Sequence, residues 1–233
     1  MLTCANLVMR FGGVHAIDGV DFELSAGHVH CVIGPNGAGK STLFKMLTGQ
    51  LRPSAGSIRL RGIDITGRST NAIVNLGIGV KMQTPQLFET ETARDNIWLG
   101  ANRRFAPREA VERTAALVEE LALGAHADKV VGTLAHGIRQ RVEVAGVLAS
   151  EPELVLLDEP AAGMSDADVA DLAELILRRR GRQSFLVVEH DITFVRSIAD
   201  LVPCSIKVAS SSKAIATRFC STKWSRTSTL GRG

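Results

Sequence analysis

Three short runs of mostly apolar residues stand out along the chain, and each predicts a strand buried on both faces of a sheet. They lie at residues 28–33, 154–157 and 185–188. Strands covered on both faces occur in parallel sheets, where helices lie over each side. Each run leads directly into glycine or charged residues, and ligands bind at the carboxyl ends of the strands in open α/β sheets. The pattern therefore predicts an α/β core with a ligand site at one edge.

The first part of the chain follows a different pattern, in which apolar and polar residues alternate. Val20, Phe22 and Leu24, for example, are separated by single acidic residues. Alternation with a period of two is typical of strands that bury one face and leave the other in water. It occurs within residues 2–33 and again at residues 57–66, where a central glycine predicts the turn of a hairpin. We expect these strands to form an antiparallel layer over the core.

A helical pattern begins in the middle of the chain. Between Pro107 and Leu123, apolar residues recur at helical spacing, with Glu and Arg between them. This spacing places the apolar side chains on one face of an amphipathic helix. Residues 84–150 are therefore predicted to be a helical insertion between two parts of the core.

The stretch that follows the first apolar run matches the phosphate-binding pattern G-x-x-x-x-G-K-[ST]. In such a loop, glycines let backbone N–H groups turn inward around a phosphate chain, and the next helix adds the positive end of its dipole. Lys40 would neutralise the β and γ phosphates, and the Ser41 hydroxyl would bind Mg²⁺. We therefore predict a nucleotide site formed by Gly34, Pro35, Asn36, Gly37, Ala38, Gly39, Lys40, Ser41 and Thr42.

Two carboxylates follow the second apolar run. Asp158 and Glu159 stand at the predicted carboxyl end of that strand. Asp158 would hold Mg²⁺ directly or through water, and Glu159 is placed to polarise the attacking water. A strand followed by a solvated acidic turn is the competing interpretation. It becomes the weaker one once Lys40 and Ser41 are taken into account.

The third apolar run leads to a histidine, His190. A neutral imidazole at this edge can donate a hydrogen bond to a γ-phosphate oxygen and accept one from the catalytic water. With this residue the chain resembles the ATP-binding subunit of ABC transporters over about residues 2–202. The resemblance rests on the order of the phosphate loop, Gln83, the region of Gly137, Asp158 with Glu159, and His190.

This resemblance implies an α/β fold: a P-loop NTPase core of the ABC ATPase type, with an antiparallel β layer and an inserted helical subdomain. It also implies ATP and Mg²⁺ as cofactors. We expect the nucleotide-binding core and its β layer at residues 1–83 and 151–204, and the helical subdomain at residues 84–150. Residues 205–233 form an atypical tail.

Two further roles are implied by the resemblance alone. Gln83 is similar to the glutamine that contacts Mg²⁺ and the attacking water, and that begins the lobe facing the membrane partner. Without the flanking motifs it would be interpreted as an ordinary surface residue. Phe11 resembles the aromatic that stacks on adenine, although an aromatic residue at a strand end is equally well explained as part of the core.

The family signature, Leu-Ser-Gly-Gly-Gln at the start of a helix, is only partly present. The corresponding positions hold Leu134, Ala135, His136, Gly137 and Ile138. Ala135 lacks the hydroxyl that would reach the γ-phosphate of ATP on a partner subunit. Gly137 is retained, and the N–H groups at the start of the following helix remain available to an anion. The resemblance therefore implies a nucleotide contact at Gly137.

Composition agrees with a globular α/β protein. With 233 residues, 45% of them hydrophobic, the chain can bury a core without disulfides or metals. No apolar run approaches the roughly 18 residues of a membrane span, so we expect no direct span and contact with the membrane through a partner. The four cysteines form no C-x-x-C pair, which argues against a zinc site or a disulfide framework.

The end of the chain differs in charge from the rest. No Asp or Glu follows Asp200, whereas six Lys or Arg do, so residues 1–200 hold 21 basic and 24 acidic residues and the tail carries the excess positive charge. Two interpretations compete: a basic arm that binds phosphate head groups, nucleic acid or a partner, or a segment out of register with the family that forms little native structure. We favour the second, because the tail lacks the aromatic or Gly-Arg patterning suited to RNA.

The strings at residues 10–13 and 159–164 are most similar to subunits of branched-chain amino acid and urea importers. We therefore predict an ATP-binding and ATP-hydrolysing subunit of such an importer, at the cytoplasmic face of the cell membrane. The expected partners are transmembrane permease subunits and a second ATPase subunit, paralogous or identical; nucleic acid is not expected. The alternatives are the energising subunit of a lipid or lipopolysaccharide exporter, or a cytosolic ABC ATPase of DNA repair or translation.

Overall fold

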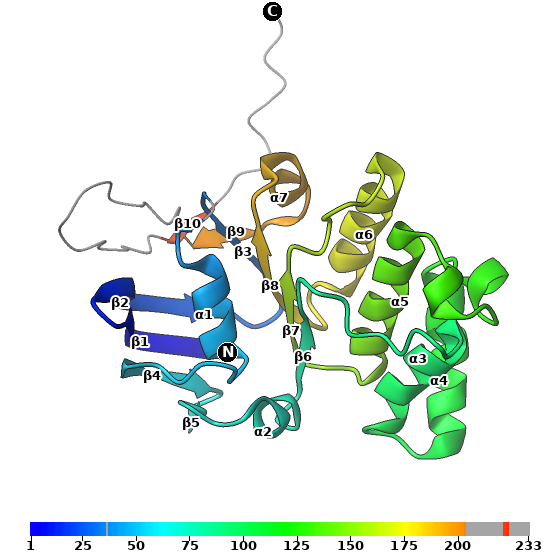
Figure 1. Ribbon diagram of the computed structural model, residues 1–233, viewed down its shortest axis with the longest axis horizontal. Coiled ribbons are helices and arrows are strands. Elements are labelled where there is room, and N and C mark those ends of the chain that lie inside the picture. The colour runs from blue at the N-terminus through cyan, green and yellow to red at the C-terminus, as the bar shows by residue number, and fades with distance from the viewer. Residues whose placement is uncertain (36, 204–220, 224–233) are drawn as a thin grey trace, which may run out of the picture.

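The computed structural model describes residues 1–35, 37–203 and 221–223 of the chain. These residues form a central six-stranded sheet with a four-stranded sheet on one side and a group of helices on the other (Figure 1). The architecture is the predicted α/β core with an antiparallel β layer and an inserted helical part.

The central sheet has the strand order β10-β9-β3-β8-β7-β6. The three apolar runs of the sequence form β3 (Val29–Ile33), β7 (Leu154–Asp158) and β8 (Ser184–Glu189), and β6 spans Ile78–Lys81. All four run parallel, with Ile33 paired to Glu189, Asp158 to Val188 and Lys81 to Leu157. Their carboxyl ends therefore meet at one edge, as the sequence predicted.

Side chains along these strands alternate between two apolar clusters. Val155 and Leu157 of β7 pack in the cluster that includes the helices, whereas Leu154 and Leu156 pack in the cluster shared with the antiparallel sheet. β8 divides in the same way. Successive side chains of a strand point to opposite faces, so a run of consecutive apolar residues fills two cores at once.

The antiparallel sheet has the order β2-β1-β4-β5 and is built from β1 (Leu2–Phe11), β2 (Val14–Leu24), β4 (Ala55–Leu60) and β5 (Ile63–Asp64). β4 and β5 form the predicted hairpin, in which Arg61 and Gly62 both have positive φ. This geometry is typical of the tight turns that match the twist of two paired strands. The sheet provides one wall of the core that also holds helix α1 (Lys40–Leu47).

Helices α3 (Ala93–Asn102), α4 (Pro107–Glu120) and α5 (His136–Ala149) gather on the side of the central sheet away from the antiparallel layer (Figure 1). Two 3₁₀ turns, Gly124–His126 and Val131–Thr133, join α4 to α5. The helices α3 and α5 pack closely at Gly100, where an added Cβ would lie 2.0 Å from the carbonyl oxygen of Gly146. The short helix α2 (Thr70–Val74) precedes β6.

Helix α6 (Asp166–Arg179) follows β7, and α7 (Ile192–Ile198) follows β8. The Ser165 side chain accepts a hydrogen bond from the N–H of Asp168, and Arg178 and Arg179 lie in the last turn. A polar cap at the start and cations at the end satisfy both ends of the helix dipole. This arrangement positions the segment 159–165, which leaves the carboxyl edge of the sheet.

At the end of the described chain, β9 (Leu201–Pro203) and β10 (Ser221–Lys223) pair antiparallel at the edge of the central sheet. Apart from residues 221–223, the tail predicted at residues 205–233 lies outside the described residues. Within the described ranges, the helices are too short or too polar to cross a membrane.

Candidate functional site

The phosphate loop connects β3 to α1. Gly37 and Gly39 both have positive φ, 80° and 87°, a conformation that side-chain-bearing residues rarely adopt. An added Cβ at Gly39 would lie 2.7 Å from the carbonyl oxygen of Ala16, whereas one at Gly37 would meet no atom within 4 Å. The loop is thus closed by β2 on one side and open at Gly37. Asn36, predicted to belong to the loop, lies outside the described residues.

The start of α1 is suited to bind an anion. Gly39 is its N-cap, no side chain caps it, and its first turn holds no acidic residue. Lys40 is 5% exposed, and its Nζ donates hydrogen bonds to the carbonyl oxygens of Gly34 at 2.5 Å and Pro35 at 3.0 Å. A helix N-terminus, glycine backbone and a cation folded over the loop form a cradle that fits a polyphosphate. Ser41 is exposed beside it.

The acidic end of β7 lies two strands away from the loop. Asp158 is 7% exposed, and this burial, followed by the charge of Glu159, raises its pKa from 3.8 to about 6. Two cations, Lys81 and then Lys40, oppose the rise. A buried carboxylate that is costly to keep charged is stabilised when a positive ligand binds beside it. The raised pKa of Asp158 is therefore typical of a site that binds a cation.

Glu159 has φ of 46°, in the left-handed region, which costs a residue with a side chain on the order of 1 kcal/mol. Its backbone N–H donates to the carbonyl oxygen of Val188 at 2.9 Å, which holds this turn against β8. Strained backbone of this kind is concentrated at functional sites, where the surrounding structure determines it. The turn directs the Glu159 carboxylate toward residues from the neighbouring strands.

Gln83 and His190 lie on either side of that carboxylate. The Nε2 of Gln83 donates to Oε2 of Glu159 at 2.9 Å, and Nδ1 of His190 lies 3.8 Å from Oε1. Gln83 follows β6 and His190 follows β8, so three strands contribute to one cluster. Residues that are distant in the sequence therefore come together where the sequence predicted a catalytic group.

A buried carboxylate to which the sequence pattern assigned no role lies beneath this cluster. Glu189 is 1% exposed and accepts hydrogen bonds from the N–H groups of Ala161 at 3.1 Å and His190 at 3.0 Å. It thereby joins the segment after β7 to the segment after β8. In the sequence, Glu189 is marked only as a charged residue directly after an apolar run. That its side chain is buried could be identified only from the register of β8.

The oxygen ligands expected for Mg²⁺ fit that ion. Ser41, Gln83 and Asp158 offer a hydroxyl, an amide and a carboxylate, and Mg²⁺ in nucleotide sites uses few protein ligands together with water and phosphate oxygens. Among the described residues, no cluster of three or more His, Cys, Asp or Glu forms a metal site. The hydroxyl, amide and carboxylate of this donor set fit a metal that is bound together with a nucleotide.

Gly137 lies in the first turn of α5, packed against α6. An added Cβ would lie 2.7 Å from Oδ2 of Asp168, and Oδ1 of Asp168 accepts a hydrogen bond from Arg141 at 2.5 Å. The glycine therefore has a packing reason in addition to its predicted contact with nucleotide. The N-cap Ala135 provides no side-chain hydrogen bond, so the helix start lacks a side-chain cap.

His136 occupies a signature position where the family has glycine. Its Nε2 lies 3.2 Å from the carbonyl oxygen of Ala162, and an added Cβ at Gly163 would lie 3.0 Å from its ring. The imidazole thus contacts the segment between β7 and α6 of the same subunit. The sequence marked His136 as a departure from the signature but gave no indication of this contact.

Phe11 ends β1 and is 47% exposed. The exposure leaves its ring available for stacking and makes a role in the core the weaker explanation.

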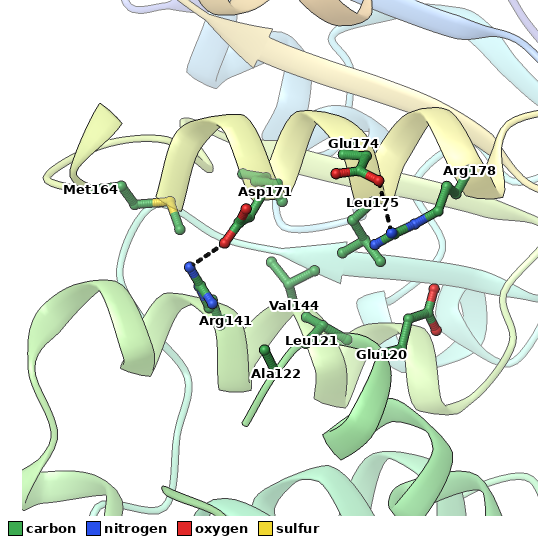
Figure 2. Close-up of a pocket in the computed structure, with 11 residues that line it drawn as sticks. Glu120, Leu121, Ala122, Arg141, Val144, Met164, Asp171, Glu174, Leu175 and Arg178 are labelled. Carbon is green, nitrogen blue, oxygen red and sulfur yellow. Dashed lines mark hydrogen bonds and ion pairs between the residues drawn. The ribbon is translucent and has the colours of Figure 1, made fainter. Parts of the chain in front are cut away.

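A cavity of about 200 Å³ lies between α5, α6 and the end of α4 (Figure 2). Arg141 points toward Asp171 across it, with a hydrogen bond of 2.6 Å, and Arg178 pairs with Glu174 along α6. Leu121, Val144 and Leu175 contribute apolar surface. None of the residues predicted to contact nucleotide or metal lines this cavity, so it is separate from the site at the edge of the sheet.

Comparison with known proteins agrees with this geometry. The sequence profile described as "ABC transporter" matches residues 17–162. The chain belongs to the ABC transporter family. It is 37% identical over 218 residues to the high-affinity branched-chain amino acid transport ATP-binding protein BraF of Pseudomonas aeruginosa, with 86% of each chain covered. It is 34% identical over 220 residues to LivG of Escherichia coli, of the same description, covering 87% of this chain and 86% of LivG.

A solved structure, the ADP conformation of an ATP-binding cassette of an ABC transporter, superposes with a TM-score of 0.75 at 30% identity. The match covers 87% of this chain and 85% of that cassette. The fold predicted from the sequence, an ABC ATPase core, is thereby confirmed.

Proposed function

We propose that the chain is the ATP-binding and ATP-hydrolysing subunit of an ABC importer for branched-chain amino acids or a similar small polar solute such as urea. The observation that carries the proposal is the meeting of Gln83, Glu159 and His190 at the sheet edge that also holds the phosphate loop. The importer class is supported by the similarity to BraF and LivG over most of the chain.

ATP would bind with adenine against Phe11 and its phosphates in the loop Gly34–Thr42. Lys40 exchanges its hydrogen bonds to the loop carbonyl oxygens for the phosphate oxygens, and the N–H groups at the start of α1 complete the anion site. Ser41, Gln83 and Asp158 would hold Mg²⁺, which neutralises phosphate charge when bound.

Glu159 would accept a proton from the attacking water. In the structure its carboxylate accepts a hydrogen bond from Gln83, so this hydrogen bond must open or be shared as water enters. The exposed His190 would donate to the γ-phosphate from the other side, while Glu189 fixes its backbone. Positioning and charge stabilisation of this kind account for most catalysis of phosphoryl transfer.

A second ATPase subunit would complete the site. The start of α5, with Gly137 in its first turn, offers N–H groups to the nucleotide of that partner. Ala135 and Ile138 supply fewer side-chain donors than the family signature, and each lost hydrogen bond to a charged phosphate is worth roughly 1.5–3 kcal/mol. A pair formed with a paralogous subunit that has a complete signature would suffer this loss at one site only. A pair of two identical subunits would suffer it at both.

The permease would dock in a groove of about 340 Å³ between β6 and helices α3 and α5. Its lining includes Phe88 and Leu99, which are 61% and 40% exposed, as well as Met82 and Gln86 beside Gln83. An exposed apolar groove beside the catalytic cluster suits a short permease segment. A segment docked there would link the conformation of the permease to the catalytic residues. Such docking would place the chain at the cytoplasmic face of the membrane.

Uptake in a strain that lacks the gene tests the proposal. Complementation with the wild-type gene should restore uptake of radiolabelled leucine or urea, and complementation with Glu159→Gln should not. If neither solute is taken up better with the wild-type gene than with the empty vector, the proposed solute class is wrong.

A further inference from the structure

The segment that carries Gln83 has no regular secondary structure. Residues 82–88 connect β6 to the turn before α3, and Gln83 is exposed at its start. The amide of Gln83 nevertheless donates to Oε2 of Glu159 at 2.9 Å. A flexible amide in irregular backbone needs an anchor to hold such a position, because ordering a free segment costs conformational entropy.

Both ends of this segment are tied to one carboxylate, that of Glu143 on α5. Oε1 of Glu143 accepts a hydrogen bond from the N–H of Gln86 at 2.9 Å. Oε2 lies 3.4 Å from Nζ of Lys81, which also donates to the carbonyl oxygen of Met82 at 3.2 Å. Glu143 therefore holds the chain two residues before Gln83 and three residues after it.

This ion pair is buried almost completely. The Lys81 side chain is 0% exposed and that of Glu143 is 5% exposed. Removing two charges from water is costly, and well-packed apolar residues at such positions are often as stable or more stable. Stability alone therefore does not explain why this buried ion pair is present. Its contacts on either side of Gln83 provide an explanation.

We infer that the Lys81–Glu143 pair positions Gln83 for hydrolysis and couples that position to α5. The inference rests on the proposed hydrolysis at Glu159. Because α5 begins with the signature segment and Glu143 also lines the groove proposed for the permease, movement of α5 moves the carboxylate to which both ends of the Gln83 segment are tied. Glu143 and Lys81 act through Gln83, as positioning residues.

The test is a cycle of variants measured by steady-state ATP hydrolysis. Lys81→Met combined with Glu143→Leu removes both charges and both ties, Gln83→Ala removes the positioned amide, and a third variant carries all three substitutions. The paired substitution should lower kcat about tenfold or more and leave KM for ATP unchanged, since misplacement of a catalytic group acts on the reacting geometry. Added to Gln83→Ala, it should lower kcat no further.

Leu148→Ala is the matched control, because Leu148 is buried in the apolar cluster on the same helix. It should lower the melting temperature and leave kcat unchanged. Independent, multiplicative losses from Gln83→Ala and the paired substitution would overturn the inference, as would a paired variant with wild-type kcat. If the paired variant fails to fold, Lys81→Gln combined with Glu143→Met, which keeps side-chain length and still removes both charges and the acceptor for the Gln86 N–H, is taken through the same cycle with the same two outcomes. A wild-type protein that hydrolyses no ATP would contradict the proposed function instead.

Discussion

Replacing Asp158 with Asn should stabilise the nucleotide-free protein at neutral pH. Burial and the charge of Glu159 raise the pKa of Asp158 to about 6 from its ordinary 3.8. The folded protein thus favours the protonated form, and the resulting stabilisation is fully present below the unfolded pKa and lost as pH rises through about 6. A shift of this size corresponds to about 3 kcal/mol, since one pKa unit is worth about 1.4 kcal/mol.

The assay is urea unfolding without nucleotide or metal, followed by circular dichroism at about pH 4.5 and about pH 7.5. Asn is neutral at both values, so the advantage of Asp158→Asn in unfolding free energy should grow between them, by about 2 of the full ~3 kcal/mol, because a pH of about 4.5 already lies above the unfolded pKa. Glu119→Gln makes the same change of charge at an exposed position of α4 and should show no comparable growth. A difference between Asp158→Asn and wild type that is independent of pH would refute the reasoning.

The remaining predictions concern the phosphate loop, the start of α5 and the signature. Lys40→Ala should weaken ATP binding by roughly 2–5 kcal/mol in a fluorescent-nucleotide titration, because the phosphates lose a buried cation partner. Lys45→Ala, on the exposed face of α1, is the control and should not weaken binding. Equal affinities of the two variants would argue against the phosphate cradle. Gly137→Ala should lower stability by about 1–3 kcal/mol in thermal melts, because the added Cβ displaces the Asp168 carboxylate. Gly124→Ala, where an added Cβ meets no atom within 4 Å, is the control and should be nearly neutral in the same assay. The triple variant Ala135→Ser, His136→Gly and Ile138→Gln should hydrolyse ATP faster than the wild type; a rate no higher would count against the weak-signature argument.

The periodicity of the sequence was sufficient to predict the sheet edge and the elements that meet there. Consecutive apolar residues, as at 154–157, occur where a strand has a core on each face, and the polar residues that follow such runs must then lie at the edge. The phosphate loop could be predicted because its spacing of glycine, lysine and serine rarely arises by chance, and Gly39 has the backbone conformation that only glycine adopts easily.

The buried charges could not be predicted in this way. Lys81 and Glu143 are 62 positions apart in the sequence, and each alone resembles a solvated surface residue. Only the packing of α5 against the end of β6 removes both from water and pairs them. Glu189 was equally ambiguous, because the register of β8 decides whether a terminal carboxylate points into the fold or into solvent.

We propose that Glu159 activates water at an ATP site built from the phosphate loop, and a comparison of the wild type with Glu159→Gln tests this role. ATP hydrolysis and ATP binding are measured on the same preparations of wild type and Glu159→Gln, with size-exclusion chromatography in the presence of ATP. Glu159→Gln should bind ATP as tightly as the wild type, accumulate as an ATP-bound dimer and lose hydrolysis by about a hundredfold or more. A Glu159→Gln variant that hydrolyses ATP at the wild-type rate would contradict the assignment.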